Sequence, residues 1–204
     1  VSYNSLLVNT FHYPGTFDGS NTSYVDEYNR SYYEPYSNAN PDGYEDATER
    51  AQREHPRPEP RFRIEHYSLP NLAQIRRTKE LGVVASIQPP FVFTNGAMSK
   101  SRAEASGGDV RAFPFKTMLF EGLTVSASSD SPCAPVNPML GLGSIVTRMP
   151  RSGGAPVEPE EAVTPLEGLR MYTIDAAYAM SREAEVGSLE KGKRADLAVL
   201  SHDP

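Results

Sequence analysis

The spacing of apolar residues along the chain changes several times between residues 60 and 130. Three short runs of apolar and β-branched residues predict buried strands, over residues 62–65, 83–87 and 123–128. The segments between them have helical spacing and predict helices over residues 70–81 and 115–120. Gly82 and Gly122 follow these helices directly and predict tight turns into the next strand. This order of strands and helices is typical of parallel βαβ units.

The pattern outside these units is more varied. Residues 44–54 form a polar, helix-favouring run that ends before a proline-rich segment. Residues 165–180 predict a longer helix with Thr164 as its N-cap. The Gly- and Ser-rich stretch over 88–113 predicts a long loop, and residues 187–200 predict a turn followed by a strand.

Residues 1–43 show neither a helical nor a two-residue apolar period. Eight of the eleven tyrosines lie within the first 44 residues, among Asn, Ser, Gly and Pro. Because aromatic rings are able to pack on a neighbouring surface, we expect a long loop or arm here rather than clear disorder.

Three strands cannot close a barrel, and a (β/α)8 barrel typically needs about 250 residues. The chain has 204 residues and begins with Val rather than Met, so we expect the last part of a longer barrel. The predicted fold class is α/β. An arm over residues 1–43 precedes a partial barrel over 44–183, and a terminal segment follows over 184–204.

Composition narrows the function classes. The formal net charge is −6 and no run of Lys or Arg is present, which argues against nucleic acid and anionic membranes as partners. The single cysteine, Cys133, excludes an intrachain disulfide and fits a reducing compartment. No apolar run approaches the ~20 residues of a membrane span, and the N-terminus lacks the pattern of a signal peptide. The expected location is cytoplasmic.

Candidate chemistry lies where two predicted strands end. Asp130 follows the strand over 123–128, and Pro132 prevents that strand from continuing. His66 follows the first strand in the same way. A carboxylate at the end of a core strand is costly unless it is hydrogen-bonded, paired or metal-bound. Imidazole and carboxylate are both zinc ligands, and a carboxylate beside a metal-bound water is able to take its proton.

Structural interpretations of both residues remain open at this point. A histidine at a strand end is often only hydrogen-bonded, and an aspartate before Ser-Pro is often the cap of a turn. Cys133 reads as a small loop residue rather than a nucleophile.

Four motifs in order resemble the metal-dependent amidohydrolases, and most closely the C-terminal portion of amidohydrolase family 3, the group of YtcJ-like and N-substituted formamide deformylase-like enzymes. They are Arg63–His66, Ser128–Pro132 with Asn137-Pro138, Leu169–Ala179 and Gly187–Leu200. The resemblance covers about residues 43–204.

The resemblance implies strands six to eight of a (β/α)8 barrel that uses a divalent metal, most compatibly zinc, with one or two ions in the full enzyme. His66 would be the strand-six metal ligand, and Asp130 both the strand-eight ligand and the catalytic base. Residues 88–113 would help to shape the pocket for a small amide-type substrate, whose binding residues are unknown. Residues 184–204 would return into a small β-sandwich subdomain and supply its terminal strand.

Several family features have no counterpart in this sequence. The His-x-His pair of the first strand and the strand-four carboxylate or modified lysine are absent, and no histidine stands at 34–42, where the strand-five ligand is expected. Two protein ligands are fewer than the three of a usual catalytic zinc site, so we expect the isolated chain to be inactive.

Two functions therefore stand beside each other: a metal-dependent hydrolase of non-peptide C–N bonds, and an inactive remnant acting as an interaction or structural protein. A flavodoxin-like binding domain is a third interpretation, but it would need a Gly-rich phosphate loop after a strand, and the sequence has none. A partial barrel also leaves strand edges open, which favours self-association as a homo-oligomer. The residues expected to lose cover are Val84, Ile87, Val125, Leu197, Val199 and Leu200.

Overall fold

The structure is a computed structural model that describes residues 42–201, with side chains from residue 45 onward. The predicted arm over residues 1–43 lies almost entirely outside the described residues. The chain divides into two compact units, residues 1–62 and residues 63–204, and each is described by itself.

The described part of the first unit is built around helix α3 (Asp42–Glu54), which confirms the predicted helix. An ion pair of 2.9 Å joins Arg50 to Glu54 one turn later and lowers the pKa of Glu54. The side chain of Gln52 donates to the carbonyl of Arg57 and accepts from its amide, at 2.8 and 3.1 Å. These bonds tie down the proline-rich segment that ends the helix.

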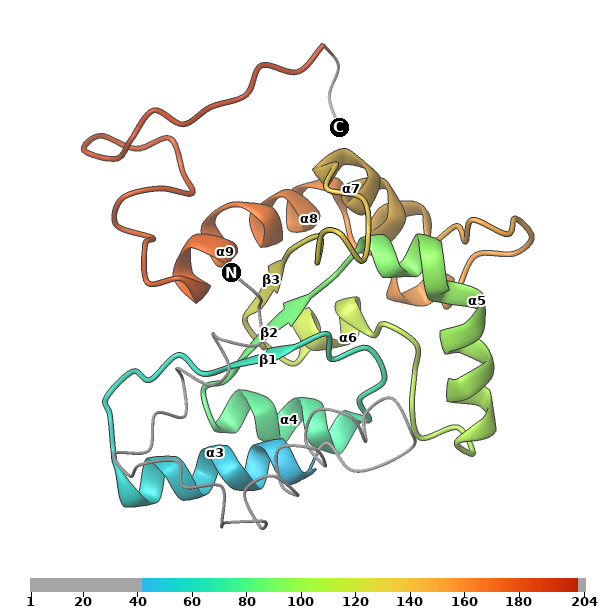
Figure 1. Cartoon of the computed structure of the whole chain (residues 1–204), viewed down its shortest axis with the longest axis horizontal. Coiled ribbons are helices and arrows are strands. Elements are labelled where there is room, and N and C mark those ends of the chain that lie inside the picture. Colours follow the sequence, from blue (N-terminus) through green and yellow to red (C-terminus); the bar gives the residue numbers. More distant parts are fainter. Residues whose placement is uncertain (1–41, 202–204) are drawn as a thin grey trace. The chain divides into compact units, whose positions relative to one another are not determined.

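The second unit is organised on a parallel sheet of three strands in the order β1, β2, β3 (Figure 1). The strands are β1 (Arg63–Glu65), β2 (Val84–Ile87) and β3 (Val125–Ala127), joined through helices α4 (Leu72–Glu80) and α6 (Phe115–Phe120). This confirms the predicted βαβ order. Gly82 and Gly122 have φ angles of +66° and +78°, the left-handed conformation that ends each helix at no steric cost.

The two faces of the sheet differ in polarity because side chains alternate along each strand. Ile64, Ala85 and Val125 stand opposite one another in register and form a buried apolar row. The next row consists of Glu65, Ser86 and Ser126, all polar.

The predicted loop over residues 88–113 is wrong, since it contains the sixteen-residue helix α5 (Pro90–Ala105). Its buried positions include Val92, Gly96, Ser99 and Ala103, which have helical spacing but small side chains. A Cβ on Gly96 would lie 2.9 Å from the side chain of Val157, so the small face allows close packing. Gly and Ser suggested a loop where they form the contact face of a helix.

Four further helical segments follow β3 within the described residues. They are α7 (Pro138–Thr147), the 3-10 turn η2 (Pro159–Glu161), and a pair of helices in place of the single one predicted over 165–180, α8 (Pro165–Tyr172) and α9 (Ile174–Ala179). Thr164 caps α8 as predicted, in a capping box with Glu167. The helix breaks at Thr173, where Gly187 packs so closely that a Cβ would lie 3.0 Å from the Thr173 carbonyl oxygen.

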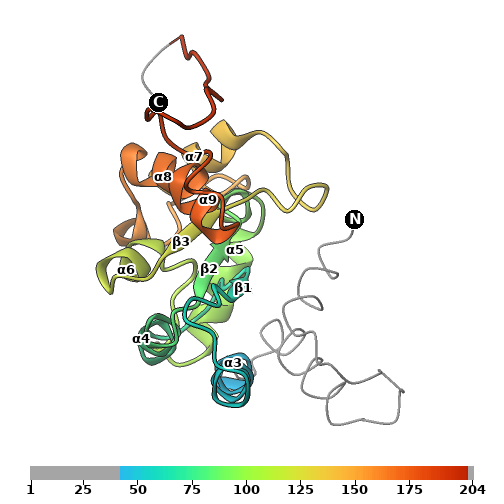
Figure 2. The ribbon, with the colours of Figure 1, turned by 90° about the vertical axis from the view of Figure 1, so that its left-hand side faces the viewer.

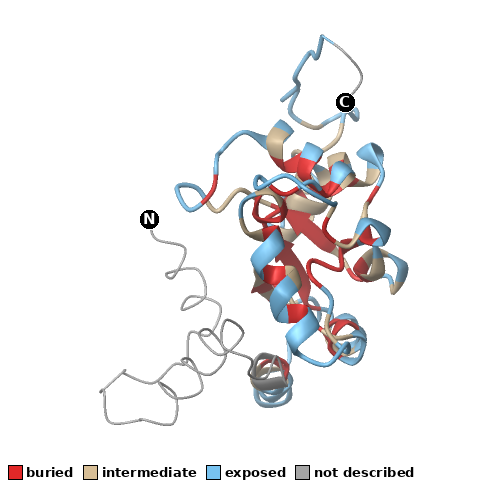
Figure 3. Cartoon of the chain, turned by 90° about the vertical axis from the view of Figure 1, so that its right-hand side faces the viewer, coloured by how far each residue is buried: buried red, intermediate tan, exposed pale blue. Residues whose placement is uncertain are grey.

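Helices α8 and α9 pack against β3, the edge strand of the sheet as described (Figure 2). The core consequently lies around the sheet, whose strands β2 and β3 are buried along their whole length (Figure 3). Val84, Ile87 and Val125 are each at most 1% exposed, so the prediction that they lose cover is wrong.

The strand predicted within residues 187–200 is also wrong for the described residues. The turn is present, closed by a hydrogen bond of 3.2 Å from the Lys193 amide to the Glu190 carbonyl, but no strand follows it. A strand needs a neighbour for its amides and carbonyls, and no described segment pairs with this one. The apolar residues of this tail are consequently exposed, as predicted: Leu197 (62%), Val199 (90%) and Leu200 (44%).

Candidate functional site

The two predicted ligands lie at one edge of the sheet. His66 directly follows β1, and Asp130 comes three residues after the end of β3. Because the strands are parallel, both segments leave the sheet at its carboxyl edge, with β2 between them. The ladder continues past the strands, since the His66 amide donates to the Ser86 carbonyl and the Ser128 amide to the Ile87 carbonyl, each at 2.9 Å. Both functional side chains are half-buried.

The backbone is strained at both positions. His66 has φ +70° and Asp130 has φ +54°, values that cost a residue with a Cβ about 1–2 kcal/mol. The imidazole of His66 stacks on Phe91, from the first turn of α5, with ring centroids 5.8 Å apart and planes 16° apart. Strain of this kind persists only where the surroundings hold it, and it is common at functional sites.

Asp130 closes its turn with its backbone rather than with its side chain. The Cys133 amide donates to the Asp130 carbonyl at 2.7 Å, while the carboxylate makes no hydrogen bond or ion pair with any described residue. A carboxylate that caps a turn would accept a hydrogen bond from a nearby backbone amide, and the Asp130 carboxylate accepts none from the described residues. Cys133 is exposed in this turn, in agreement with its interpretation as a loop residue.

Sequence reasoning missed Gln88, which stands at the end of the central strand. Its side chain is 4% exposed, and its amide nitrogen donates to the Ser86 carbonyl at 3.2 Å and to Ser128 Oγ at 3.0 Å. Its carbonyl oxygen Oε1 is buried without a hydrogen-bond partner among the described residues. The same rule that found His66, a polar residue directly after a buried strand, would have found Gln88.

The donor set fits a divalent metal in kind but is incomplete. Imidazole nitrogen and carboxylate oxygen are the donors that zinc accepts in catalytic sites. Between residues 42 and 201, no group of three or more His, Cys, Asp and Glu residues is arranged to hold an ion. The described residues thus supply two candidate donors, His66 and Asp130. The position of the expected strand-five ligand, 34–42, lies almost wholly outside them.

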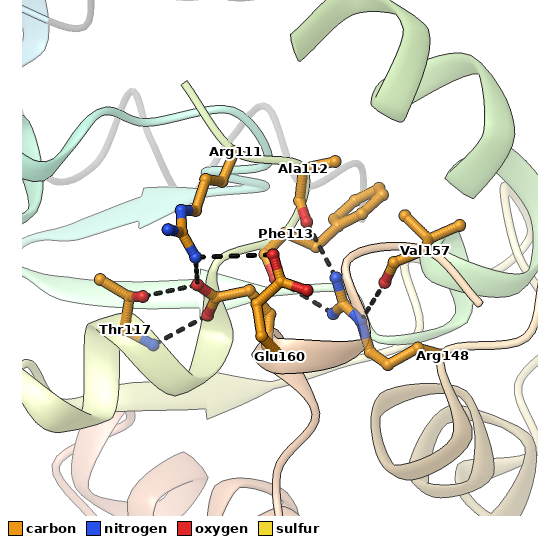
Figure 4. A network of polar contacts seen from close by, with 8 residues as sticks. Arg111, Ala112, Phe113, Thr117, Arg148, Val157 and Glu160 are labelled. Carbon is orange, nitrogen blue, oxygen red and sulfur yellow. Dashed lines mark hydrogen bonds and ion pairs between the residues drawn. The ribbon is translucent and has the colours of Figure 1, made fainter. Parts of the chain in front are cut away.

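A second polar cluster is satisfied internally (Figure 4). Arg148 ends α7 with its side chain fully buried, and it donates to the carbonyls of Val157, Phe113 and Ala112 at 2.8, 3.0 and 2.8 Å. Burial lowers the pKa of Arg148 to about 10, so the guanidinium stays charged at neutral pH. Its bonds therefore join the segment that precedes α6 to the segment that follows α7.

Glu161 completes this cluster from the 3-10 turn η2. Its carboxylate accepts from the amide and the hydroxyl of Thr117, at 2.9 and 2.6 Å, and pairs with Arg111 at 3.1 Å. Because Arg148 and Glu161 are fully engaged with protein groups, we assign the cluster to the scaffold rather than to chemistry.

A parallel α/β sheet with polar side chains gathered at its carboxyl edge is the arrangement of enzymes that place their chemistry on βα loops. The chain belongs to the amidohydrolase family, whose sequence model matches residues 33–204. This confirms the family resemblance stated from the motifs.

Individual relatives agree with this assignment. The chain is 39% identical over 143 residues to N-substituted formamide deformylase of Arthrobacter pascens, covering 70% of this chain and 26% of that protein. It is 28% identical over 149 residues to the putative amidohydrolase YtcJ of Bacillus subtilis, covering 70% of this chain and 27% of that protein. The chain thus spans about a quarter of the length of these relatives.

A solved structure has the same fold. An uncharacterized metal-dependent hydrolase from Pyrococcus furiosus superposes with a TM-score of 0.62 at 32% sequence identity, covering 79% of this chain and 31% of that one. None of the helices within residues 42–201 has both the length and the apolar character needed to cross a membrane.

Proposed function

We propose that this chain forms strands six to eight of a (β/α)8 barrel in a metal-dependent hydrolase of non-peptide C–N bonds. The observation that carries the proposal is the presence of His66 and Asp130 at one carboxyl edge of a continuous parallel sheet, in the segments that follow strands β1 and β3. Support for the reaction class comes from the family match and from the metal-dependent hydrolase that shares the fold.

In this proposal His66 and Asp130 hold a divalent metal, with zinc the ion that best suits a nitrogen and oxygen donor pair. When bound, such an ion lowers the pKa of a coordinated water and polarises a substrate carbonyl. Three protein ligands are usual in catalytic zinc sites, so at least one further ligand comes from outside residues 42–201.

Asp130 has a second role as general base. Its carboxylate is half-buried and makes no hydrogen bond or ion pair with any described residue, so it is available to accept a proton. In the proposed reaction, oxygen of the attacking water bonds to the carbonyl carbon, and Asp130 takes the water proton. The C–N bond then breaks, and the same proton passes to the leaving nitrogen.

The proposed substrate class is a small amide or formamide. The support is the 39% identity to a protein that bears the name N-substituted formamide deformylase. An inactive remnant remains the second candidate, because the described residues provide only two donors.

Zinc binding tests the proposal directly. We expect the purified protein to retain zinc after dialysis, measured by elemental mass spectrometry, and His66→Ala and Asp130→Ala each to weaken zinc binding in calorimetry by more than about 100-fold. Removal of a group that only hydrogen-bonds to a metal ligand typically lowers metal affinity about 10- to 100-fold, so removal of a ligand itself should lower it more. His55→Ala and Asp109→Ala, at exposed positions that do not follow a strand of the sheet, are the matched controls.

A substrate test completes the experiment. We expect formate release from N-substituted formamides by the complete barrel protein that contains this chain, and none from the same protein with Asp130→Asn. Absence of zinc binding in the wild-type protein would refute the hydrolase proposal and favour the inactive remnant. Equal loss of zinc in the two control variants would show that binding is not specific to this edge.

A further inference from the structure

Gln88 connects the two segments that carry His66 and Asp130. It belongs to the central strand end, and its amide nitrogen donates to a carbonyl and to a hydroxyl. The carbonyl is that of Ser86, at 3.2 Å, which also accepts the backbone amide of His66 at 2.9 Å. The hydroxyl is that of Ser128, at 3.0 Å, two residues before Asp130. One buried side chain is therefore bonded directly to the segment that precedes Asp130, and it shares the Ser86 acceptor of its own strand with the backbone amide of His66.

The orientation of this amide follows from its partners. The Ser86 carbonyl is only an acceptor, so the nitrogen of the Gln88 side chain must face it. The oxygen Oε1 must then point the other way, where it is buried and has no hydrogen-bond partner among the described residues. A buried acceptor without a partner lowers stability. Stability alone therefore does not explain a glutamine at this position.

We propose that Gln88 is a positioning residue, which braces the Asp130 segment from the central strand through Ser128 and thereby sets its place relative to His66, whose amide bonds to the same Ser86 carbonyl. The inference rests on the proposed function, since it concerns the residues assigned there as ligands and base. Asp130 needs such a brace because its backbone is held at φ +54°, while its own turn is closed by backbone bonds and by a bond of 3.3 Å from the Ser131 amide to Ser129 Oγ. Supports of this kind orient metal ligands in many sites.

Gln88→Met tests the brace, because Met has similar length and volume but donates no hydrogen bond. We expect the variant to unfold at the same or a higher temperature than the wild type, since the partnerless acceptor is gone. We expect its zinc affinity, measured by calorimetry, to fall about 10- to 100-fold. The visible spectrum of the cobalt-substituted protein should change as well, because it reports coordination geometry. Gln52→Met, in helix α3, is the matched control.

Ser128 provides the partner test. Ser128→Ala removes the second acceptor and should weaken zinc binding, whereas Ser128→Thr keeps the hydroxyl and should restore binding. If both residues act through one hydrogen bond, the double variant Gln88→Met/Ser128→Ala binds zinc no more weakly than the weaker of the two single variants. Full additivity of the two losses would overturn the proposed link.

Amide exchange separates this inference from the proposed function. The Cys133 amide is bonded to the Asp130 carbonyl, so its exchange rate reports whether the Asp130 turn is held. We expect roughly tenfold faster exchange of this amide in Gln88→Met, and an unchanged rate in Gln52→Met. A wild-type protein that binds no zinc defeats the proposed function, while the exchange rates still decide whether Gln88 braces the turn. Unchanged exchange, or wild-type zinc affinity in Gln88→Met when His66→Ala has lost binding, overturns the inference.

Discussion

Gly141 of α7 packs directly against the ring of Tyr172 of α8, and the pair allows a quantitative test of the packing. A Cβ at position 141 would overlap Tyr172 Oη, lie 2.9 Å from Tyr172 Cζ and lie 3.4 Å from Pro90 Cδ. Gly141 is helical and does not have a positive φ, so it is required here for space rather than for conformation. The hydroxyl of Tyr172 is buried and has no hydrogen-bond partner among the described residues.

Two opposing terms determine the effect of Gly141→Ala. In an exposed helix interior, Ala is more stable than Gly by about 1 kcal/mol. Forcing a methyl group into a filled site costs about 1–3 kcal/mol, and the overlap with Tyr172 Oη places this site at the upper end. We therefore expect a net loss of about 2 kcal/mol in the free energy of unfolding, which is the difference of these two estimates.

Gly143→Ala is the matched control on the same helix. A Cβ there meets no atom within 4 Å, so only the propensity term remains. We expect this variant to be more stable than the wild type by about 0.5–1 kcal/mol. The comparison uses urea denaturation followed by circular dichroism.

Tyr172→Phe should rescue the clash. The oxygen that overlaps is removed, and the closest ring atom is then Cζ at 2.9 Å, so the ring still has to shift but the direct overlap is gone. No hydrogen bond is lost with the hydroxyl, so Tyr172→Phe alone should be neutral or stabilising. We expect the double variant to recover about 1 kcal/mol or more of the loss. Gly141→Ala as stable as Gly143→Ala, or no coupling to Tyr172→Phe, would refute this packing.

Three further predictions concern pH dependence and association. Burial raises the pKa of Tyr172, so the phenol loses its proton at a lower pH in the unfolded chain than in the folded one. The free energy of unfolding should therefore fall as the pH rises above about 10. Tyr172→Phe should lack this part of the decline in denaturation experiments. Hydrogen bonds from Thr164 lower the pKa of Glu167. The contribution of Glu167 to the free energy of unfolding is therefore present above about pH 4.3 and is lost as the pH falls through the lower pKa of the folded state. Glu167→Gln should flatten the dependence of stability on pH in this range, and an unchanged curve would contradict the capping box. The exposed apolar tail should promote self-association of the protein. Val199→Lys should therefore lower the sedimentation coefficient at high protein concentration. A wild-type protein that is already monomeric would contradict this prediction.

The second and third strands could be predicted because they are short apolar runs that each follow a glycine, Gly82 or Gly122, whose positive φ ends the preceding helix. Helix α5 could not, because its buried face consists of small residues such as Gly96 and Ser99, which carry no hydrophobic signal. The break at Thr173 was equally hidden, since it depends on Gly187, fourteen residues away in sequence and in contact only after folding. Propensity describes a segment alone, whereas packing against a neighbour decided both cases.

At the candidate site, His66 and Asp130 could be found because strand ends of parallel sheets converge at one edge. Gln88 occupies the equivalent place on the central strand but was missed, since an amide is a less usual metal ligand than imidazole or carboxylate and two prolines follow it. Its role becomes apparent only from partners that are distant in sequence, above all Ser128. The sequence therefore identified two side chains of the kinds that bind metals and overlooked the buried amide that is bonded to the segment preceding one of them.

The loops at this edge also support one another, which gives a reason for the early start of α5. The helix begins only three residues after β2, so its first turn brings Phe91 onto the imidazole of His66. The extended loop predicted from the sequence would have placed no fixed ring there. Stacking on one side and the continued ladder to Ser86 on the other hold His66 at a φ of +70° that it would not adopt alone. Strain at His66 is thus balanced by contacts from strand β2 and helix α5, and Gln88 lies in the short connection between these two elements.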